Sequence, residues 1–335
     1  MPPEASVTAP VPAPPARLPE AWHSPLLALG AATLALMIVT AQAWGAMAYQ
    51  WWHIDTYNHL LLVPFIIAWL VGLKEEDLSL LAPRPFVPGL IGVAAGLVLW
   101  RIGTGAGINL VAQAGAVAAL QAAAVTILGV RTSLVLALPI AFAAFMVPFG
   151  DEIIPPLQHI TAEIAIALTH ASGVPAKIDG IHIDTPAGLF IVAEACSGVK
   201  FLVAMVTLGV LVCATRFRRW ATRTAFMAAC VIVPVIANGV RAWATIYVAQ
   251  YVGAEKATGF DHIVYGWVFF AIIIAVLLSA AWRFVEREPD SYGWPLGVID
   301  EWRWVSRAEA FSVAPGRAGL AIIALAGVAA LSMLL

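Results

Sequence analysis

The chain has 335 residues, of which 61% are hydrophobic and only 11% are charged. Soluble globular domains are about half apolar and about a quarter charged, so this composition excludes a soluble enzyme, a disordered scaffold and a nucleic-acid-binding protein with a basic face. The 18 basic and 20 acidic residues nearly cancel, and the three cysteines form no C-x-x-C pair for a zinc or redox site. The composition therefore predicts an all-α polytopic membrane protein.

Residues 1–25 contain eight prolines and little apolar periodicity. Such a segment is typical of a disordered or polyproline-like tail. We expect a cytoplasmic tail that precedes a membrane-embedded domain over residues 26–284.

Apolar segments of spanning length follow this tail. A transmembrane helix needs about 20 mostly apolar residues, because every backbone polar group must be paired inside the hydrocarbon. This rule predicts a bundle of eight to nine spanning helices, over residues 26–47, 58–73, 88–106, 109–129, 132–149, 197–214, 222–246, 262–283 and 318–334. Small residues let such helices pack closely, and Gly103, Gly105, Gly107 and Gly115 lie within or between the third and fourth segments.

The basic residues predict the orientation of the bundle. The loop after the sixth predicted span carries four arginines and no acidic residue among them: Arg216, Arg218, Arg219 and Arg223. Because Lys and Arg are enriched in cytoplasmic loops, we place this loop in the cytoplasm. The alternation of spans then puts further basic residues on the same side, namely Lys74, Arg84, Arg131, Arg283 and Arg287. Residues 285–317 are expected there as an interfacial segment, before a last transmembrane helix within 318–335.

The opposite, non-cytoplasmic side receives residues 150–195, the longest segment between spans on that face. This segment carries six acidic residues and a single lysine, Lys177. Residues 157–171 have the pattern of an amphipathic helix lying on the membrane. Residues 176–193 alternate in places between apolar and polar side chains around Gly180, which predicts a small hairpin.

Three residues with reactive side chains fall at the outer face in this topology. Cys196 opens the sixth span, Arg241 lies near the outer end of the seventh and His262 begins the eighth. A thiol is nucleophilic as the thiolate, which a helix N-terminus or a neighbouring cation favours. His262 would pass a proton to a leaving amine, and Arg241 would hold an oxyanion or a substrate carboxylate.

Each of these residues also has a purely structural interpretation. A cysteine in an apolar helix is usually a small hydrophobic residue, and an arginine near a helix end usually extends to the headgroups. Arg241 is harder to explain in that way, because it is embedded with Asn238 in an apolar run and ionisable groups inside a membrane are functional by default. The other histidines lack metal-binding spacing, so we predict no metal and no cofactor.

The chain resembles the exosortase/archaeosortase family of membrane transpeptidases, closest to the exosortase A type, over about residues 25–285. Three separated motifs carry the resemblance in order: Glu194-Ala195-Cys196-Ser197-Gly198, Asn238-x-x-Arg241 and His262-x-x-Tyr265-Gly266. An earlier segment, Tyr57-Asn58-His59-Leu60, is similar to the family's Tyr-x-His-Gly segment, with leucine in place of the glycine.

The resemblance implies that Cys196 is the nucleophile of a cysteine peptidase or transpeptidase. Its partners would be Arg241 and His262, with six supporting residues: Glu194, Ser197, Gly198, Asn238, Tyr265 and His59. The implied substrates are secreted proteins that end in a Pro-Glu-Pro-like motif, a transmembrane helix and a basic cluster. The enzyme would cleave this sorting signal through a thioacyl intermediate and transfer the protein to an unidentified cell-envelope acceptor. It would lie in the bacterial inner membrane, with its active site facing the periplasm.

Other functions remain compatible with the same residues. A transporter or channel would use Arg241, Asn238 and His262 to line a pathway for an anion or a proton. A non-catalytic component of polysaccharide export would use the three motifs only to stabilise the bundle. A plain intramembrane protease would resolve the thioester with water. Hydrolysis and transpeptidation stay open, because no acceptor-binding group is identifiable in the sequence.

Overall fold

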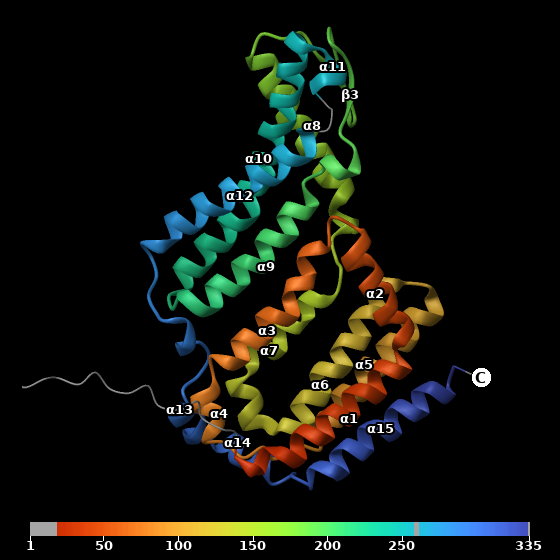
Figure 1. Ribbon diagram of the computed structural model, residues 1–335, viewed down its shortest axis with the longest axis vertical. Helices are drawn as coiled ribbons and strands as arrows, with labels where there is room; N and C mark the ends of the chain where they lie inside the picture. The colour runs from red at the N-terminus through yellow and green to blue at the C-terminus, as the bar shows by residue number, and fades with distance from the viewer. Residues whose placement is uncertain (1–18, 258–260, 334–335) are drawn as a thin grey trace, which may run out of the picture.

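The computed structural model describes residues 19–257 and 261–333, without the side chains of residues 256 and 261–265. Its long apolar helices run roughly parallel to one another, and a smaller head of α8, α11, the end of α10 and a sheet extends beyond them (Figure 1). The helices are α1 (His23–Val39), α2 (Ala41–His53), α3 (Val63–Gly72), α4 (Glu75–Ser79), α5 (Gly89–Ala106), α6 (Asn109–Val135), α7 (Ala137–Phe142), α8 (Ile154–Ala171), α9 (Val199–Arg216), α10 (Trp220–Val252), α11 (Ala254–Ala257), α12 (Asp261–Trp282), α13 (Leu296–Glu301), α14 (Arg303–Glu309) and α15 (Pro315–Leu331). Single 3-10 turns connect several of them: η1 (Glu20–Trp22), η2 (Asn58–Leu62), η3 (Ala143–Met146), η4 (Asp151–Ile153), η5 (Glu194–Cys196) and η6 (Pro289–Ser291).

Five helices in the described part of the chain are long and apolar enough to cross a membrane. Two bent pairs, residues 41–53 with 58–72 and residues 137–146 with 151–171, raise this number to seven if each pair is one span. Residues 266–282 and 315–331 form shorter apolar helices. The protein is therefore an all-α polytopic membrane protein, as the composition predicts. The count of eight to nine spans stays a prediction.

The first predicted span, residues 26–47, is wrong as a single helix, because α1 ends at Val39 and α2 begins at Ala41. The Thr40 hydroxyl donates to the Leu36 carbonyl at 2.8 Å and accepts the indole N–H of Trp44 at 3.1 Å. A threonine hydroxyl that bonds back to the preceding turn competes with the helix and bends it. Average hydropathy over a window does not detect such a local bond.

The N-terminal helix begins earlier than predicted. Residues 19–25 belong to the tail predicted over 1–25, yet η1 starts at Glu20 and α1 at His23. The buried indole of Trp22 fixes this start, since its N–H donates to the carbonyls of Leu78 at 3.2 Å and Leu81 at 2.8 Å. Residues 1–18, on which the rest of that prediction falls, lie outside the described residues.

Helices α5 and α6 form a closely packed pair. A Cβ atom at Gly103 would collide with the backbone of Ala112, and one at Gly115 with the backbone of Trp100. The two backbones therefore approach each other as closely as glycine allows, which confirms the packing role predicted for these two residues. Gly107 acts differently: with φ +69° it ends α5 in the left-handed conformation that glycine adopts readily.

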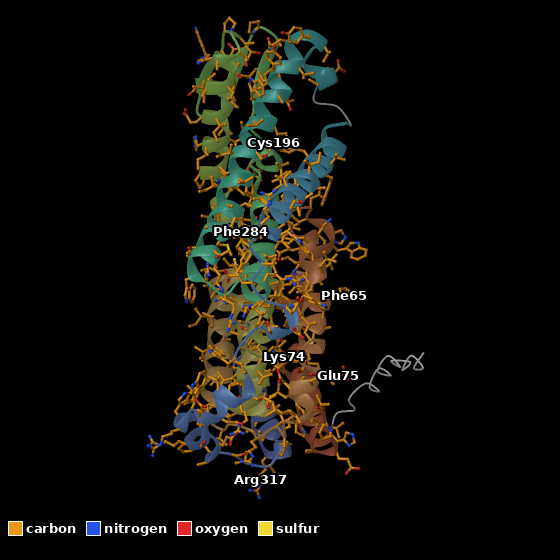
Figure 2. The ribbon with its side chains drawn as sticks, turned by 90° about the vertical axis from the view of Figure 1, so that its left-hand side faces the viewer. Phe65, Lys74, Glu75, Cys196, Phe284 and Arg317 are labelled. Carbon is orange, nitrogen blue, oxygen red and sulfur yellow. The ribbon has the colours of Figure 1, made fainter. Side chains whose placement is uncertain are left out.

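Basic residues from separate loops gather around residues 285–317 at one end of the bundle. The contacts are ion pairs of Arg84 and Arg131 with Glu309, of Arg131 with Asp300 and of Arg216 with Glu288, and a cation–π contact of Lys74 with Tyr292. Figure 2 shows Lys74 and Arg317 toward the opposite end of the molecule from Cys196. This arrangement agrees with basic loops on one side of the membrane. Which side is cytoplasmic stays a prediction.

The head carries a three-stranded antiparallel sheet. Strands β1 (Lys177–Asp179), β2 (His182–Thr185) and β3 (Gly188–Ile191) lie in the order β1-β2-β3, with Ile183 opposite both Ile178 and Phe190. Ile183 is buried against α8. The predicted hairpin is confirmed, and a third strand extends it.

Helix α8 confirms a helix over 157–171, and its position relative to the membrane stays a prediction. It packs along the C-terminal half of α10, where Gly239 lies against Ile164 and the Trp243 indole donates to the Ser172 hydroxyl at 2.9 Å. Helix α10 has 33 residues, about 50 Å at 1.5 Å per residue, whereas the hydrocarbon core is about 30 Å thick. Its excess length therefore offers α8 a protein surface for the apolar stripe that was expected to face lipid.

Candidate active site

Cys196 is half-buried and ends the η5 turn that follows β3. The sequence predicts that Cys196 opens the sixth span, whereas α9 starts only at Val199. The thiol therefore lies just before the first helical turn. The backbone reverses at Gly198, whose φ of +83° is the left-handed region favoured by glycine.

Asn238 of α10 connects Cys196 to the rest of the site. Its amide N–H₂ donates to the Cys196 carbonyl at 2.8 Å and to the Thr161 hydroxyl of α8 at 3.0 Å. Its amide oxygen accepts a hydrogen bond from the Arg241 guanidinium at 3.2 Å. Since Asn238 is only 2% exposed, these partners replace water for both ends of the amide. Residues 194–198, the cysteine loop, are thereby held in one fixed arrangement with α8 and α10.

Arg241 points its guanidinium group from α10 toward α9 and α12. The guanidinium carbon lies 5.6 Å from the ring centroid of Phe201, and a Cβ atom at Gly266 would lie 3.0 Å from one terminal nitrogen. The group is close enough to Cys196 to interact electrostatically with it. Its buried Nε has no hydrogen-bond partner among the described residues. An arginine with an unused donor beside a thiol is suited to bind a developing oxyanion.

His262 and Tyr265 belong to the first turns of α12, but their side chains lie outside the described residues. The position of the helix is nevertheless informative, because Gly266 follows His262 by four residues and touches Arg241. The start of α12 therefore reaches the site. The proton-transfer role of His262 stays a prediction.

The remaining predicted residues differ in their positions. Ser197 is buried, and its hydroxyl accepts the Val199 N–H at 3.3 Å, so it caps the start of α9. Glu194 is exposed, and its carbonyl accepts the Ser197 N–H at 3.0 Å. His59 lines a groove beside α9, and its buried Nε2 has no hydrogen-bond partner in the described part of the chain.

A family model described as transmembrane exosortase (Exosortase_EpsH) matches residues 51–279. The chain belongs to the transmembrane exosortase family. The match includes the cysteine loop, α9, α10 and most of α12, whereas α1 and α15 lie outside it. It does not resolve the exosortase A type. No curated protein and no solved structure matches the chain.

Two site residues of this family member were not predicted from the sequence. Thr161 of α8 accepts a hydrogen bond from Asn238, and Lys200 of α9 is near enough to Cys196 and Arg241 to interact electrostatically with both. The sequence does contain a feature that indicates a functional role for Lys200, because this ionisable residue stands at the start of an apolar span. No sequence feature indicates a role for Thr161, since its contact with Asn238 depends on how α8 packs against α10.

Lys200 lies at a groove between α3, α9 and α12. The groove has a volume of about 400 Å³ and is lined mainly by apolar side chains, including Phe142, Leu208, Phe270 and Ile274. Its polar lining residues are Asp55, His59, Lys200 and Thr207. Among the described residues, no group of three or more His, Cys, Asp or Glu side chains could hold a metal ion.

Proposed function

We propose that the protein is a membrane-embedded cysteine transpeptidase that removes the C-terminal sorting signal of secreted proteins. One observation carries the proposal: in a member of the exosortase family, Asn238 binds both the Cys196 carbonyl and the Arg241 guanidinium. Two of the three family motifs thus meet at one end of the bundle, although the residues are more than 40 positions apart.

In the proposed reaction, the Cys196 thiolate attacks the carbonyl carbon of the scissile peptide bond and forms a C–S bond. Arg241 stabilises the negative charge that develops on the carbonyl oxygen. The C–N bond then breaks, and the leaving amine takes a proton from His262. A nucleophile from the envelope acceptor attacks the thioester, gives its proton back to His262 and releases the Cys196 thiolate.

The proposed substrate class has a hydrophobic helix after the cleaved motif. The apolar groove between α3, α9 and α12 lies beside the cysteine loop and has the lining that such a helix needs. The basic cluster that ends the sorting signal would remain on the cytoplasmic side. In this proposal the enzyme is of the exosortase A type and lies in the bacterial inner membrane, with Cys196 at the periplasmic face.

The test is cleavage of a tagged reporter that carries a Pro-Glu-Pro motif, a transmembrane helix and a basic cluster. Wild-type protein and the Cys196→Ala variant are co-expressed with the reporter, and membrane abundance is compared by blot. Cys213→Ala and Cys230→Ala are matched controls, because both cysteines lie within the packed interior of α9 and α10. We expect cleavage to be lost only in Cys196→Ala.

Arg241→Ala and His262→Ala extend the same assay. Loss of one oxyanion donor typically lowers the rate about 100- to 1,000-fold, and we expect an effect of that size for Arg241→Ala. If Cys196→Ala still cleaved the reporter, the proposed nucleophile would be wrong. If even the wild type cleaved no reporter, a transport or assembly function would become the better explanation.

A further inference from the structure

Lys200 is an ionisable residue in the first turn of an apolar helix. It is half-buried in the first turn of α9, and its ammonium nitrogen lies 5.3 Å from the ring centroid of Phe201 and 5.8 Å from that of Trp267. It forms no ion pair within 4 Å with any described residue. A cation at a membrane span is costly, so such a residue is a candidate for binding an anionic group.

A second cation lies beside the same ring. The ring of Phe201 is within 6 Å of both the Lys200 ammonium and the Arg241 guanidinium, at 5.3 and 5.6 Å. The two positive charges repel each other. The groups that offset Lys200 are Asp55, which is exposed to solvent across the groove, and the Cys196 thiol itself. The surroundings of Cys196 therefore carry positive charge that an anionic group would neutralise.

The apolar lining of the groove beside Lys200 indicates the chemistry of the rest of the ligand. Beyond the polar residues at its mouth, its walls are leucine, isoleucine, alanine and phenylalanine side chains from α3, α9 and α12. A molecule that fits both parts has a carboxylate at one end and an apolar stretch directly after it. In a polypeptide, this pattern is an acidic side chain followed by a hydrophobic helix.

We propose that Lys200 is a specificity-determining residue whose ammonium group binds the carboxylate of an acidic side chain just before the substrate's hydrophobic segment, while that segment occupies the groove. The proposal rests on the proposed function, because the substrate is the sorting signal. The ion pair fixes the register of the substrate along the groove. It thereby sets which peptide bond lies at the Cys196 thiol.

The test is a double-mutant cycle between enzyme and substrate. Wild type and Lys200→Gln are each combined with two reporters, one with glutamate and one with glutamine before the hydrophobic helix, and cleavage rates are measured by pulse-chase. We expect Lys200→Gln to slow cleavage of the glutamate reporter at least about tenfold, the size of a desolvated ion-pair coupling. It should slow cleavage of the glutamine reporter less than about threefold.

Two further variants separate charge from fold. Lys200→Arg keeps the positive charge and should retain the preference for the glutamate reporter. Lys177→Gln removes a lysine from the exposed strand β1 and should leave both rates unchanged. If Lys200→Gln slowed both reporters equally, Lys200 would act on the thiol and not on the substrate carboxylate, and the proposal would be wrong. If wild type cleaved neither reporter, the proposed function itself would fail, and the assignment of Lys200 with it.

Discussion

Asn238 shows how one buried side chain can organise the site. An amide offers two donors and an acceptor, and Asn238 uses them for the Cys196 carbonyl, the Thr161 hydroxyl and the Arg241 guanidinium. A carboxylate of similar shape has no donor, and an aliphatic residue would leave the Cys196 carbonyl unpaired. In the family motif Asn238-x-x-Arg241, Asn238 therefore positions the neighbouring groups, and Arg241 supplies the positive charge.

Gly198 provides a prediction at the same scale. Its φ of +83° disfavours any side chain, and a Cβ atom there would lie 2.7 Å from the amide carbon of Asn238. Gly198→Ala should therefore displace Asn238 and, with it, the link between Cys196 and Arg241. We expect reporter cleavage to fall by at least about tenfold, since small misplacements of reacting groups are costly.

Gly107 supplies the matched control for Gly198. Both glycines adopt the left-handed conformation, with φ of +69° and +83°, but a Cβ atom at Gly107 would meet no described atom within 4 Å. Gly107→Ala should share the backbone cost of about 1–2 kcal/mol, measurable as a lower thermal midpoint, while cleavage is retained. Equal loss of cleavage in the two variants would show that backbone strain, and not the contact with Asn238, is responsible.

At the scale of elements, the start of α10 depends on a residue from beyond α12. The Glu286 carboxylate accepts the backbone N–H groups of Arg219 at 2.8 Å and Arg218 at 2.5 Å, and the Thr222 hydroxyl at 3.3 Å. These N–H groups have no partner within the helix. Their hydrogen bonds, that of Arg219 first, lower the pKa of the Glu286 carboxyl below its ordinary value. Glu286 thus fixes the segment after α12 to the loop between α9 and α10.

This pKa shift predicts a pH dependence of stability. A carboxyl group with a lowered pKa in the folded state stabilises the fold above its ordinary pKa, and the stabilisation is lost as pH falls through the folded-state value. Glu286→Gln keeps an acceptor oxygen but loses the charge. Its thermal midpoint should be lower than that of wild type at pH 7, and the difference should disappear well below pH ~4.3, the ordinary value for glutamate.

Glu288→Gln is the control for the Glu286 prediction. Glu288 pairs with Arg216 at 3.6 Å, but its side chain is 83% exposed. Exposed ion pairs contribute little, so this variant should have nearly the same thermal midpoint as wild type at every pH. A pH-independent difference for Glu286→Gln would mean that shape, and not charge, fixes the start of α10.

At the scale of the whole molecule, the helices form two groups. Helices α8, α9, α10 and α12 hold the site residues, whereas α1, α5, α6 and α15 pack together on the other side (Figure 1). Helix α15 contacts α1 where Gly319 lies against Ala28, and its residues Ile322 and Ala326 are buried in the same cluster. Both helices lie outside residues 51–279, which the family model matches.

This division predicts that α15 contributes to stability more than to chemistry. Deletion of residues 313–335 should lower the thermal midpoint of the purified protein, because it exposes the packed face of α1 and opens part of the interior. Reporter cleavage per molecule in the membrane should remain within about threefold of wild type, since no residue of α15 contacts the described site. Loss of cleavage at equal abundance would show that α15 positions the site after all.

The amino-acid sequence by itself determined that the chain is an all-α membrane protein, and it predicted that Cys196, Asn238 and Arg241 lie at the same face. Hydropathy is a sum over neighbouring residues, and the family motifs are short and local, so both can be recognised without a fold. The alternating pattern around Gly180 predicted paired strands for the same reason. These properties depend on a few consecutive residues.

Only the tertiary structure decided the features that depend on distant contacts. The break at Thr40 and the packing of α8 on α10 follow from individual hydrogen bonds and side-chain shapes, which hydropathy does not contain. Thr161 and Asn238 meet across 77 positions of the chain, and Lys200 gains its surroundings only when α9 lies beside α3 and α12. The sequence supplied the polar and ionisable groups, whereas packing decided which of them lie side by side.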